Sequence, residues 1–309
     1  MLEEVVPSTI AGSKHAKDPA WMCALHQIIA RGGPVPEEYP TLHSLIGCGA
    51  ADVNAERVSR SRLREAWEVL GPRFMTDTMQ GFGLSKPHGY AGDFEMIDRI
   101  LELRTSADPS LARWDAFFHA QAAPKAVRNR ARMFGELMDS TCARASSARI
   151  LNIGSGPCRD VARWLSANPK CEVLIECIDR DPEAIAYARH VLNGQATRVR
   201  LVQRDALRYQ TGVQFDFVWS GGLFDYLSDR LFVLLFRRLL RMTNAQGQVV
   251  IGNFSPSNPS RNYMELFGEW YLHYRDDATL LRLADEAGVR RAHVISEPEG
   301  VNLFLVADA

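Results

Sequence analysis

The strongest constraint on the fold lies in residues 150–165, where an apolar run, a glycine-rich turn and a helical pattern follow one another. Residues 150–153 are typical of a buried strand, residues 154–157 (Gly-Ser-Gly-Pro) predict a tight turn, and helical spacing begins at Arg159. Glycine has no Cβ and a helix N-terminus presents free N–H groups, so a polar ligand can approach this backbone closely. Turns with two glycines also occur without a ligand, so the rest of the chain must decide between the two interpretations.

From residue 149 onward, predicted strands alternate with predicted helices. This alternation predicts an α/β fold with a parallel, doubly wound sheet. A connection as short as residues 298–300 requires the last strand to run antiparallel. The predicted strands are 150–153, 173–178, 199–202, 215–219, 249–253, 294–297 and 302–307.

Acidic residues follow two of these strands. Asp179 ends the second strand, 25 residues after Gly154, and Asp205 ends the third. A carboxylate at the first position can accept both ribose hydroxyls of a nucleoside, and one at the second can accept the exocyclic amine of adenine. Each aspartate alone would also suit a turn. Together with the glycine turn, they place the groups that one adenosine needs at the carboxyl edge of the sheet.

This constellation resembles the class I S-adenosylmethionine-dependent methyltransferases, through residues 152–157, Asp179, Asp205 and the turn at 219–223 (Trp-Ser-Gly-Gly-Leu). The resemblance implies a Rossmann-like, mostly parallel seven-stranded sheet and S-adenosylmethionine as cofactor. A dinucleotide site would prefer a third glycine, which is missing here. The cofactor-binding residues implied are Gly89, Tyr90, Asn152, Gly154, Ser155, Gly156, Asp179, Arg180, Asp205, Ala206, Ser220, Gly221 and Gly222.

The N-terminal part lacks strand alternation and is predicted to be helical. We expect two domains, a helical lid or substrate domain over residues 1–140 and a cofactor-binding domain over residues 145–309. Residues 35–50 are predicted to form a loop, and Arg130 is predicted to be solvated. The predicted helices are 20–31, 52–69, a segment beginning at Phe94, 111–119 and 127–138.

A glycine-rich loop in this part carries a second resemblance. Residues 86–94 (Lys-Pro-His-Gly-Tyr-Ala-Gly-Asp-Phe) are similar to a motif of bacterial fatty-acid methyl ester signal synthases. Enzymes that cyclise S-adenosylmethionine to azetidine-2-carboxylic acid are similar in the same stretch. Residues 252–254, 258–261 and 269–272 fit the same subgroup, and these motifs do not separate the two reactions.

Three functions therefore stay open. The first is methyl transfer to a small acid or hydroxyl acceptor in secondary metabolism or signalling. The second is cyclisation of the cofactor with release of methylthioadenosine, which needs a closed pocket and an acceptor for the ammonium proton. The third is a non-catalytic S-adenosylmethionine-binding protein. The catalytic candidates are Tyr90, Asp93, Asn253 and Tyr271.

Several further side chains are candidates for binding the acceptor or for acting as a base. A carboxylate acceptor would need a basic clamp, for which Lys86, Arg261 and Arg275 are the candidates. His88 is a candidate base, and Asp225 is interpreted as a cap of the following helix or as a base. The aromatic residues between Tyr263 and Tyr274 follow helical spacing and predict one packed helix face.

Composition narrows the class of protein further. The chain has 36 Lys and Arg against 37 Asp and Glu, so no excess of basic charge favours a nucleic-acid partner. No apolar run reaches the length of a membrane span, and acids near the start argue against a signal peptide, so we expect a cytoplasmic protein. The six cysteines form no C-x-x-C pair, so reduced thiols and no metal site are expected. A small-molecule substrate, or the cofactor itself, is the expected partner, and the oligomeric state is left open.

Overall fold

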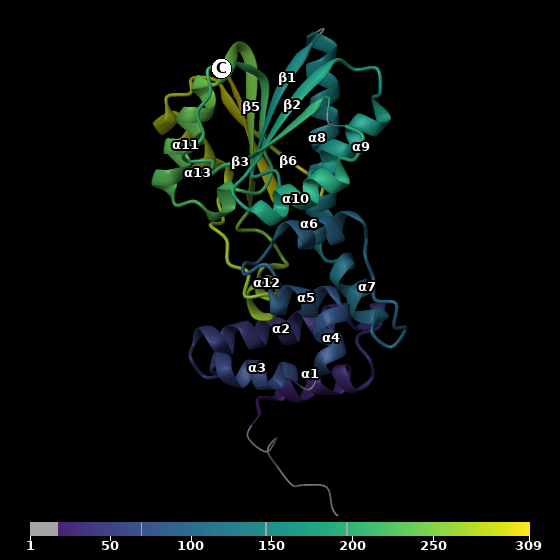
Figure 1. Cartoon of the computed structure of the whole chain (residues 1–309). Helices are drawn as coiled ribbons and strands as arrows, with labels where there is room; N and C mark the ends of the chain where they lie inside the picture. The colour runs from purple at the N-terminus through teal and green to yellow at the C-terminus, as the bar shows by residue number, and fades with distance from the viewer. Residues whose placement is uncertain (1–17, 69, 146, 196) are drawn as a thin grey trace, which may run out of the picture.

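The computed structural model describes residues 18–309 except residues 69, 146 and 196. The acidic start of the chain and the predicted helix end at Val69 lie outside the described residues. In Figure 1, a sheet flanked by helices forms one half of the molecule and a group of helices forms the other.

The sheet has seven strands in the order β3-β2-β1-β4-β5-β7-β6. Strands β1 to β5 pair in parallel, whereas β7 is antiparallel to both β5 and β6. The predicted doubly wound sheet with a reversed last strand is confirmed. The strands are β1 (Ala148–Ile153), β2 (Val173–Asp179), β3 (Val199–Gln203), β4 (Phe215–Ser220), β5 (Thr243–Phe254), β6 (Ala292–Ser296) and β7 (Asn302–Asp308).

Helices cover both faces of the sheet, which explains why its central strands are apolar at successive positions. Ile150 of β1 packs in the core beneath α8 (Ala122–Arg144), α9 (Arg159–Ala167) and α10 (Pro182–Val191). The next residue, Leu151, points to the opposite face and packs in the core beneath α11 (Asp229–Arg241) and α13 (Asp277–Ala287). Both layers are visible on the two sides of the sheet in Figure 1.

The helical half contains one long helix where a loop was predicted. Residues 39–54 form α2, with Leu42 and Ile46 buried, so the prediction of a loop over residues 35–50 is wrong. Gly49 serves close packing in this helix, because a Cβ there would lie 3.1 Å from both Leu266 and Trp21. The other helices here are α1 (Ala20–Ala30), η1 (Pro36–Glu38), α3 (Arg60–Glu68), α4 (Gly71–Asp77), α5 (Met79–Ser85), α6 (Phe94–Leu101) and α7 (Ala112–Ala120).

Two segments connect the halves. Helix α8 packs on the sheet through Phe134 and Met138. After β5 the chain crosses to the other half, where α12 (Arg261–Phe267) packs against α2, as Figure 1 shows. The prediction of helix up to Tyr274 is wrong, because α12 ends at Phe267 and Glu269 has a positive φ of 45°. The division into domains 1–140 and 145–309 stays a prediction.

None of the helices in the described part of the chain is long and apolar enough to cross a membrane.

Candidate functional site

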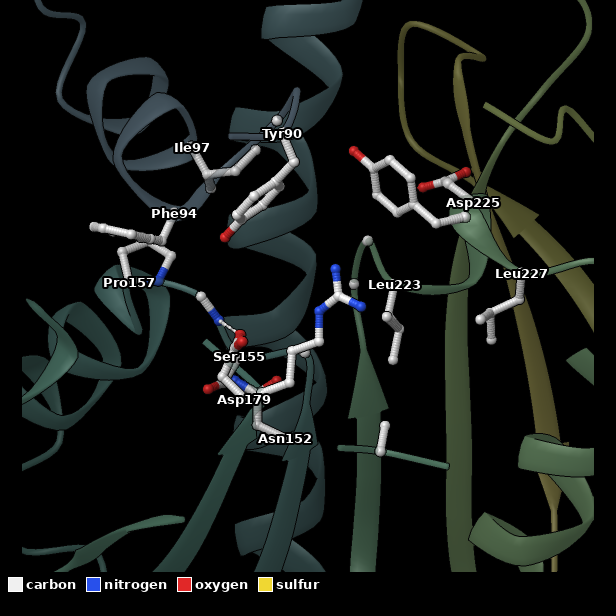
Figure 2. A pocket seen from close by; sticks show the side chains of 18 of the residues that line it. Tyr90, Phe94, Ile97, Asn152, Ser155, Pro157, Asp179, Leu223, Asp225 and Leu227 are labelled. Carbon is white, nitrogen blue, oxygen red and sulfur yellow. Dashed lines mark hydrogen bonds between the residues drawn. The ribbon is translucent and has the colours of Figure 1, made fainter. Parts of the chain in front are cut away.

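A cavity of about 500 Å³ lies at the carboxyl edge of the sheet, between the sheet and the helical half. Its volume suits a small-molecule ligand. Figure 2 shows Asn152, Ser155 and Asp179 at the ends of the strands, with Tyr90 and Ile97 on the opposite side. The predicted residues that line it are Tyr90, Asn152, Gly154, Ser155, Gly156, Asp179, Arg180, Asp205, Ala206, Gly221, Gly222 and Tyr271. The predicted residues Gly89, Asp93, Ser220 and Asn253 do not line it.

The glycine turn after β1 is held in a conformation that favours glycine. Gly154 and Gly156 have φ values of 65° and 52°. A Cβ at Gly154 would lie 2.9 Å from Cβ of Leu223, so the turn after β4 leaves no room for a side chain there. The N–H groups of Gly154 and Ser155 donate to the carbonyl of Ile178, at 2.9 and 3.0 Å. Neighbouring strands thus fix the shape of this turn.

Asp179 is oriented by backbone donors. Its Oδ2 accepts a hydrogen bond from the N–H of Gly156 at 2.9 Å, and its Oδ1 accepts one from Asp181 at 3.0 Å. Burial raises the pKa of the carboxyl group, and the two backbone bonds oppose that effect. Asp205 is similarly tied to its turn, since its Oδ1 accepts from the N–H of Leu207 at 2.7 Å. Both carboxylates therefore face the cavity from fixed positions.

Arg130 enters the cavity from α8, so the prediction that it is solvated is wrong. Its Nη1 donates to the carbonyl of Gly221 at 3.0 Å. A Cβ at Gly222 would lie 2.8 Å from Nη1, so glycine at this position makes room for the guanidinium. Burial lowers the pKa of Arg130, while the carboxylates of Asp225 and Asp160 oppose the shift. In the sequence, the feature that could have identified Arg130 as a site residue was a basic position on the apolar face of this helix, beside Val127.

The three cations predicted to form a clamp are engaged elsewhere and do not line the cavity. Lys86 pairs with Glu269 at 2.9 Å, and Arg261 pairs with Glu265 at 2.7 Å. Arg275 pairs with Asp229 and donates to the carbonyls of Phe224 and Leu227. It also donates to Oδ1 of Asn253 at 2.8 Å, which gives that fully buried amide a structural partner.

Asp225 lies in the 3₁₀ turn η2 (Phe224–Tyr226) and lines the cavity. Its Oδ1 accepts a hydrogen bond from the N–H of Phe254 at 2.6 Å, which ties η2 to β5. The interpretation of Asp225 as a helix cap is wrong, because the residue at the N-cap of α11 is Ser228. Burial raises the pKa of Asp225 to about 6, although Arg130 and Arg275 favour its ionised form.

The predicted glycine-rich loop forms part of the cavity wall through Tyr90, Ala91 and Gly92. The hydroxyl of Tyr90 donates to Oδ2 of Asp181 at 2.8 Å, and that of Tyr226 donates to the carbonyl of Ala91 at 3.2 Å. Trp270 donates from Nε1 to the Tyr226 hydroxyl at 2.8 Å. These three bonds join the loop to the sheet half and to the segment after β5.

Two other polar residues of this loop have partners outside the cavity. The ring of His88 lies between Glu183 and Glu95, with N–O distances of 2.6 and 3.0 Å. Burial of the ring acts to lower its pKa, but these carboxylates raise it. Oδ1 of Asp93 accepts from the N–H of Met96 at 2.8 Å and caps α6. Both side chains position the loop.

Because the resemblance implies that Tyr90 belongs to a cofactor site, we expect Tyr90→Phe to weaken S-adenosylhomocysteine binding by about 0.5–1.5 kcal/mol through loss of one hydrogen bond from the loop to Asp181. Isothermal titration calorimetry measures the change. Tyr187→Phe is the matched control, since its hydroxyl donates to Asp98 and the ring does not line the cavity. Equal dissociation constants for wild type and Tyr90→Phe would contradict a closing role for this bond.

A family model described as a methyltransferase domain matches residues 150–247, from within β1 into β5. The match covers about a third of the chain. The enzyme is a transferase that uses S-adenosylmethionine, and its sheet has the arrangement of class I methyltransferases. The predicted fold, enzyme class and cofactor are confirmed.

Two solved structures share the fold of this chain. One is described as a possible exported protein from Bordetella parapertussis, with a TM-score of 0.62 and 16% identity over 97% of this chain and 99% of the other. The other is a candidate O-methyltransferase from Nostoc punctiforme PCC 73102, with a TM-score of 0.51 and 16% identity over 77% and 70%. At this identity the likeness shows the fold alone. No curated protein matches the chain in sequence.

Proposed function

We propose that this methyltransferase transfers the methyl group of S-adenosylmethionine to a small acceptor bound beside Tyr226 and Trp270. The observation that supports this proposal is the extent of the cavity. It runs without a break from the Asp179 edge to an aromatic wall formed by Tyr226, Phe254 and Trp270. That wall comes from η2, from the end of β5 and from the segment after α12, beyond the residues proposed for the cofactor.

The sheet edge fits the adenosine part of the cofactor. In the proposal, the fixed carboxylate of Asp179 accepts the ribose hydroxyls, and Asp205 accepts the adenine amine. The lining between them is apolar and suits the faces of the adenine ring. The residues of this slot are Ile178, Ala206, Leu207, Leu223 and Leu227.

The inner end fits an amino-acid group. Arg130 is a half-buried cation whose hydrogen-bond acceptor in the described part of the chain is a neutral carbonyl. A partly desolvated charge of this kind is stabilised by an anion, which the methionine carboxylate supplies. Asp160 lines the same end and suits the ammonium group.

The chain contributes positioning and exclusion of water to the reaction. Bound S-adenosylmethionine supplies a methyl group on a sulfonium, whose leaving group is neutral. The polar residues at the sheet edge fix the adenosine and amino-acid ends, and the closed loop keeps water out. A second function, cyclisation of the cofactor, is favoured by the position of Asp225 near Arg130, where a base could take the ammonium proton.

One incubation tests these functions. The purified enzyme is mixed with S-adenosylmethionine alone and with an acceptor extract, and products are identified by mass spectrometry. S-adenosylhomocysteine that forms only with acceptors supports methyl transfer. Methylthioadenosine with azetidine-2-carboxylic acid and no acceptor would establish cyclisation, as the resemblance of residues 86–94 also suggests. Tight binding without either product would support a sensor.

Asp179→Ala is expected to weaken S-adenosylhomocysteine binding by about 1–3 kcal/mol through loss of charge-assisted hydrogen bonds. Calorimetry measures the dissociation constant. Asp179→Asn separates two roles, because its amide oxygen can still accept from the N–H of Gly156 and preserve the turn. An unchanged dissociation constant in Asp179→Ala would remove Asp179 from the ribose role.

A further inference from the structure

The acceptor end of the cavity carries negative charge without a free cation. Asp225 and Glu269 both line the cavity, and Glu269 is held by Lys86 and Arg64 at 2.9 and 2.8 Å. Among the described residues that line it, the cations are Arg130, Arg180 and Arg204. The proposed function assigns Arg130 to the cofactor, and the other two are exposed beside the adenosine residues in sequence. A carboxylate acceptor would therefore be buried beside the Asp225 carboxylate without a free cation to pair with it.

Asp225 presents one carboxylate oxygen that the fold does not use. Oδ1 is occupied by the N–H of Phe254 at 2.6 Å. No hydrogen bond within the described part of the chain engages Oδ2. The side chain is 3% exposed, so water does not compete freely for it. A fixed, buried carboxylate in a cavity is suited to take a proton from a bound group.

The walls around this carboxylate are aromatic. Tyr226, Phe254, Trp270 and Tyr271 all line the cavity. Trp270 lies directly against the loop backbone, since a Cβ at Gly92 would lie 2.2 Å from its ring. Rings in such a wall can stack on, or meet edge-on, an aromatic ligand of low charge.

We infer that the acceptor is an uncharged phenol and that Oδ2 of Asp225 takes the proton of its hydroxyl group. The inference rests on the proposed methyl transfer. In the step, the phenol oxygen bonds to the methyl carbon as the carbon–sulfur bond breaks, and its electron pair stays on sulfur. The hydroxyl proton passes to Asp225, so the products are an aryl methyl ether, S-adenosylhomocysteine and a neutral carboxyl group.

The acidity of the acceptor's hydroxyl group decides between a phenol and an aliphatic alcohol as the acceptor. Burial brings the pKa of Asp225 to about 6, and Arg130 and Arg275, which face it, keep it ionised at neutral pH. A phenol has a pKa of about 10 and can share its proton with such a base in the transition state. An alcohol with a pKa near that of water, about 15.7, is too weak an acid for this base.

The test compares wild type with Asp225→Asn on a phenol, an aliphatic alcohol, a benzoate and an aromatic amine. We expect ether formation from the phenol alone, and a loss of about 100-fold in kcat/KM in Asp225→Asn. The loss should be smaller for 4-nitrophenol, which is more acidic. Asp115→Asn is the matched control, because Asp115 is also a buried acid but lies outside the cavity.

A binding measurement gives an independent readout. In the presence of S-adenosylhomocysteine, the absorbance of bound 4-nitrophenol reports its ionisation. Because the Asp225 carboxylate disfavours a neighbouring phenolate, the apparent pKa of the bound phenol should fall in Asp225→Asn. In wild type, kcat/KM for the phenol should rise with pH through a value of about 6, as Asp225 loses its proton. If Asp225→Asn folds poorly, the wild-type profile decides the matter, and a wild-type kcat/KM that does not change with pH around 6 would overturn the role of Asp225.

The outcomes separate the inference from the proposed function. Preferred methylation of the benzoate, the alcohol or the amine would overturn the phenol assignment and leave methyl transfer standing. Phenol methylation with the same kcat/KM and the same nitrophenol titration in Asp225→Asn would overturn the role of Asp225. Formation of methylthioadenosine from S-adenosylmethionine alone, with no acceptor methylated, would overturn the proposed function itself.

Discussion

Arg130→Met is expected to weaken the binding of S-adenosylhomocysteine by about 1.5–3 kcal/mol, roughly 10- to 150-fold in Kd. The reason is that the guanidinium lies inside the cavity with a neutral acceptor, the carbonyl of Gly221, and suits a carboxylate of the ligand. Methionine keeps much of the apolar length of the side chain. Isothermal titration calorimetry at constant ionic strength measures the change.

Two controls make this result specific. Methylthioadenosine lacks the amino-acid end, so its Kd should be the same for wild type and Arg130→Met. Arg132→Met changes an exposed arginine of the same helix and should leave both dissociation constants unchanged. If Arg130→Met weakened both ligands equally, the guanidinium would support the shape of the cavity and not bind the carboxylate.

Gly81→Ala is expected to lower the free energy of unfolding by about 3 kcal/mol or more. A Cβ at Gly81 would lie 2.0 Å from the carbonyl oxygen of Phe74 and 2.4 Å from Cα of Met75. Both atoms belong to the backbone of α4, so α4 and α5 would have to move apart. Denaturation in urea, followed by circular dichroism, measures the change.

Gly83→Ala is the matched control for this stability prediction. It lies in the same helix, but its Cβ would meet the flexible end of Met96 at 3.2 Å. Alanine also favours a helix over glycine by about 1 kcal/mol, so a small change of either sign is expected. Equal destabilisation by the two substitutions would show that the contact with α4 does not determine the effect of Gly81→Ala.

The sheet and the residues at its carboxyl edge that line the cavity were predictable because their signals are local. A buried parallel strand is a continuous apolar run, and the turn after β1 needs glycine at positive φ. The acids at the ends of β2 and β3 follow at fixed positions. Local signals were misleading where tertiary packing decided the structure, as in α2, whose Gly49 permits contact with Trp21.

The polar half of the site was harder to predict because ion pairing is not local. Lys86 was a plausible clamp by residue type, but it pairs with Glu269, which lies 183 residues away in the chain. Arg275 is likewise enclosed by Asp229 and by the carbonyls of Phe224 and Leu227. Arg130 had to be recognised from one charged position on an apolar helix face, and nothing in the sequence shows which face meets a cavity.

Residues 254–274 connect the sheet half to the helical half, although most of the helical half comes much earlier in the chain. Tyr263 and Phe267 of α12 share one core with Trp67, Trp114 and Phe117 of the N-terminal helices. A fragment that began at residue 145 would leave the apolar side of α12 bare. Recombination that exchanged only the first 140 residues with a relative would mismatch this core. Phe254 and Trp270, which belong to the wall proposed to hold the acceptor, pack in or against this core, so they and the N-terminal helices must change together when such an enzyme acquires a new substrate.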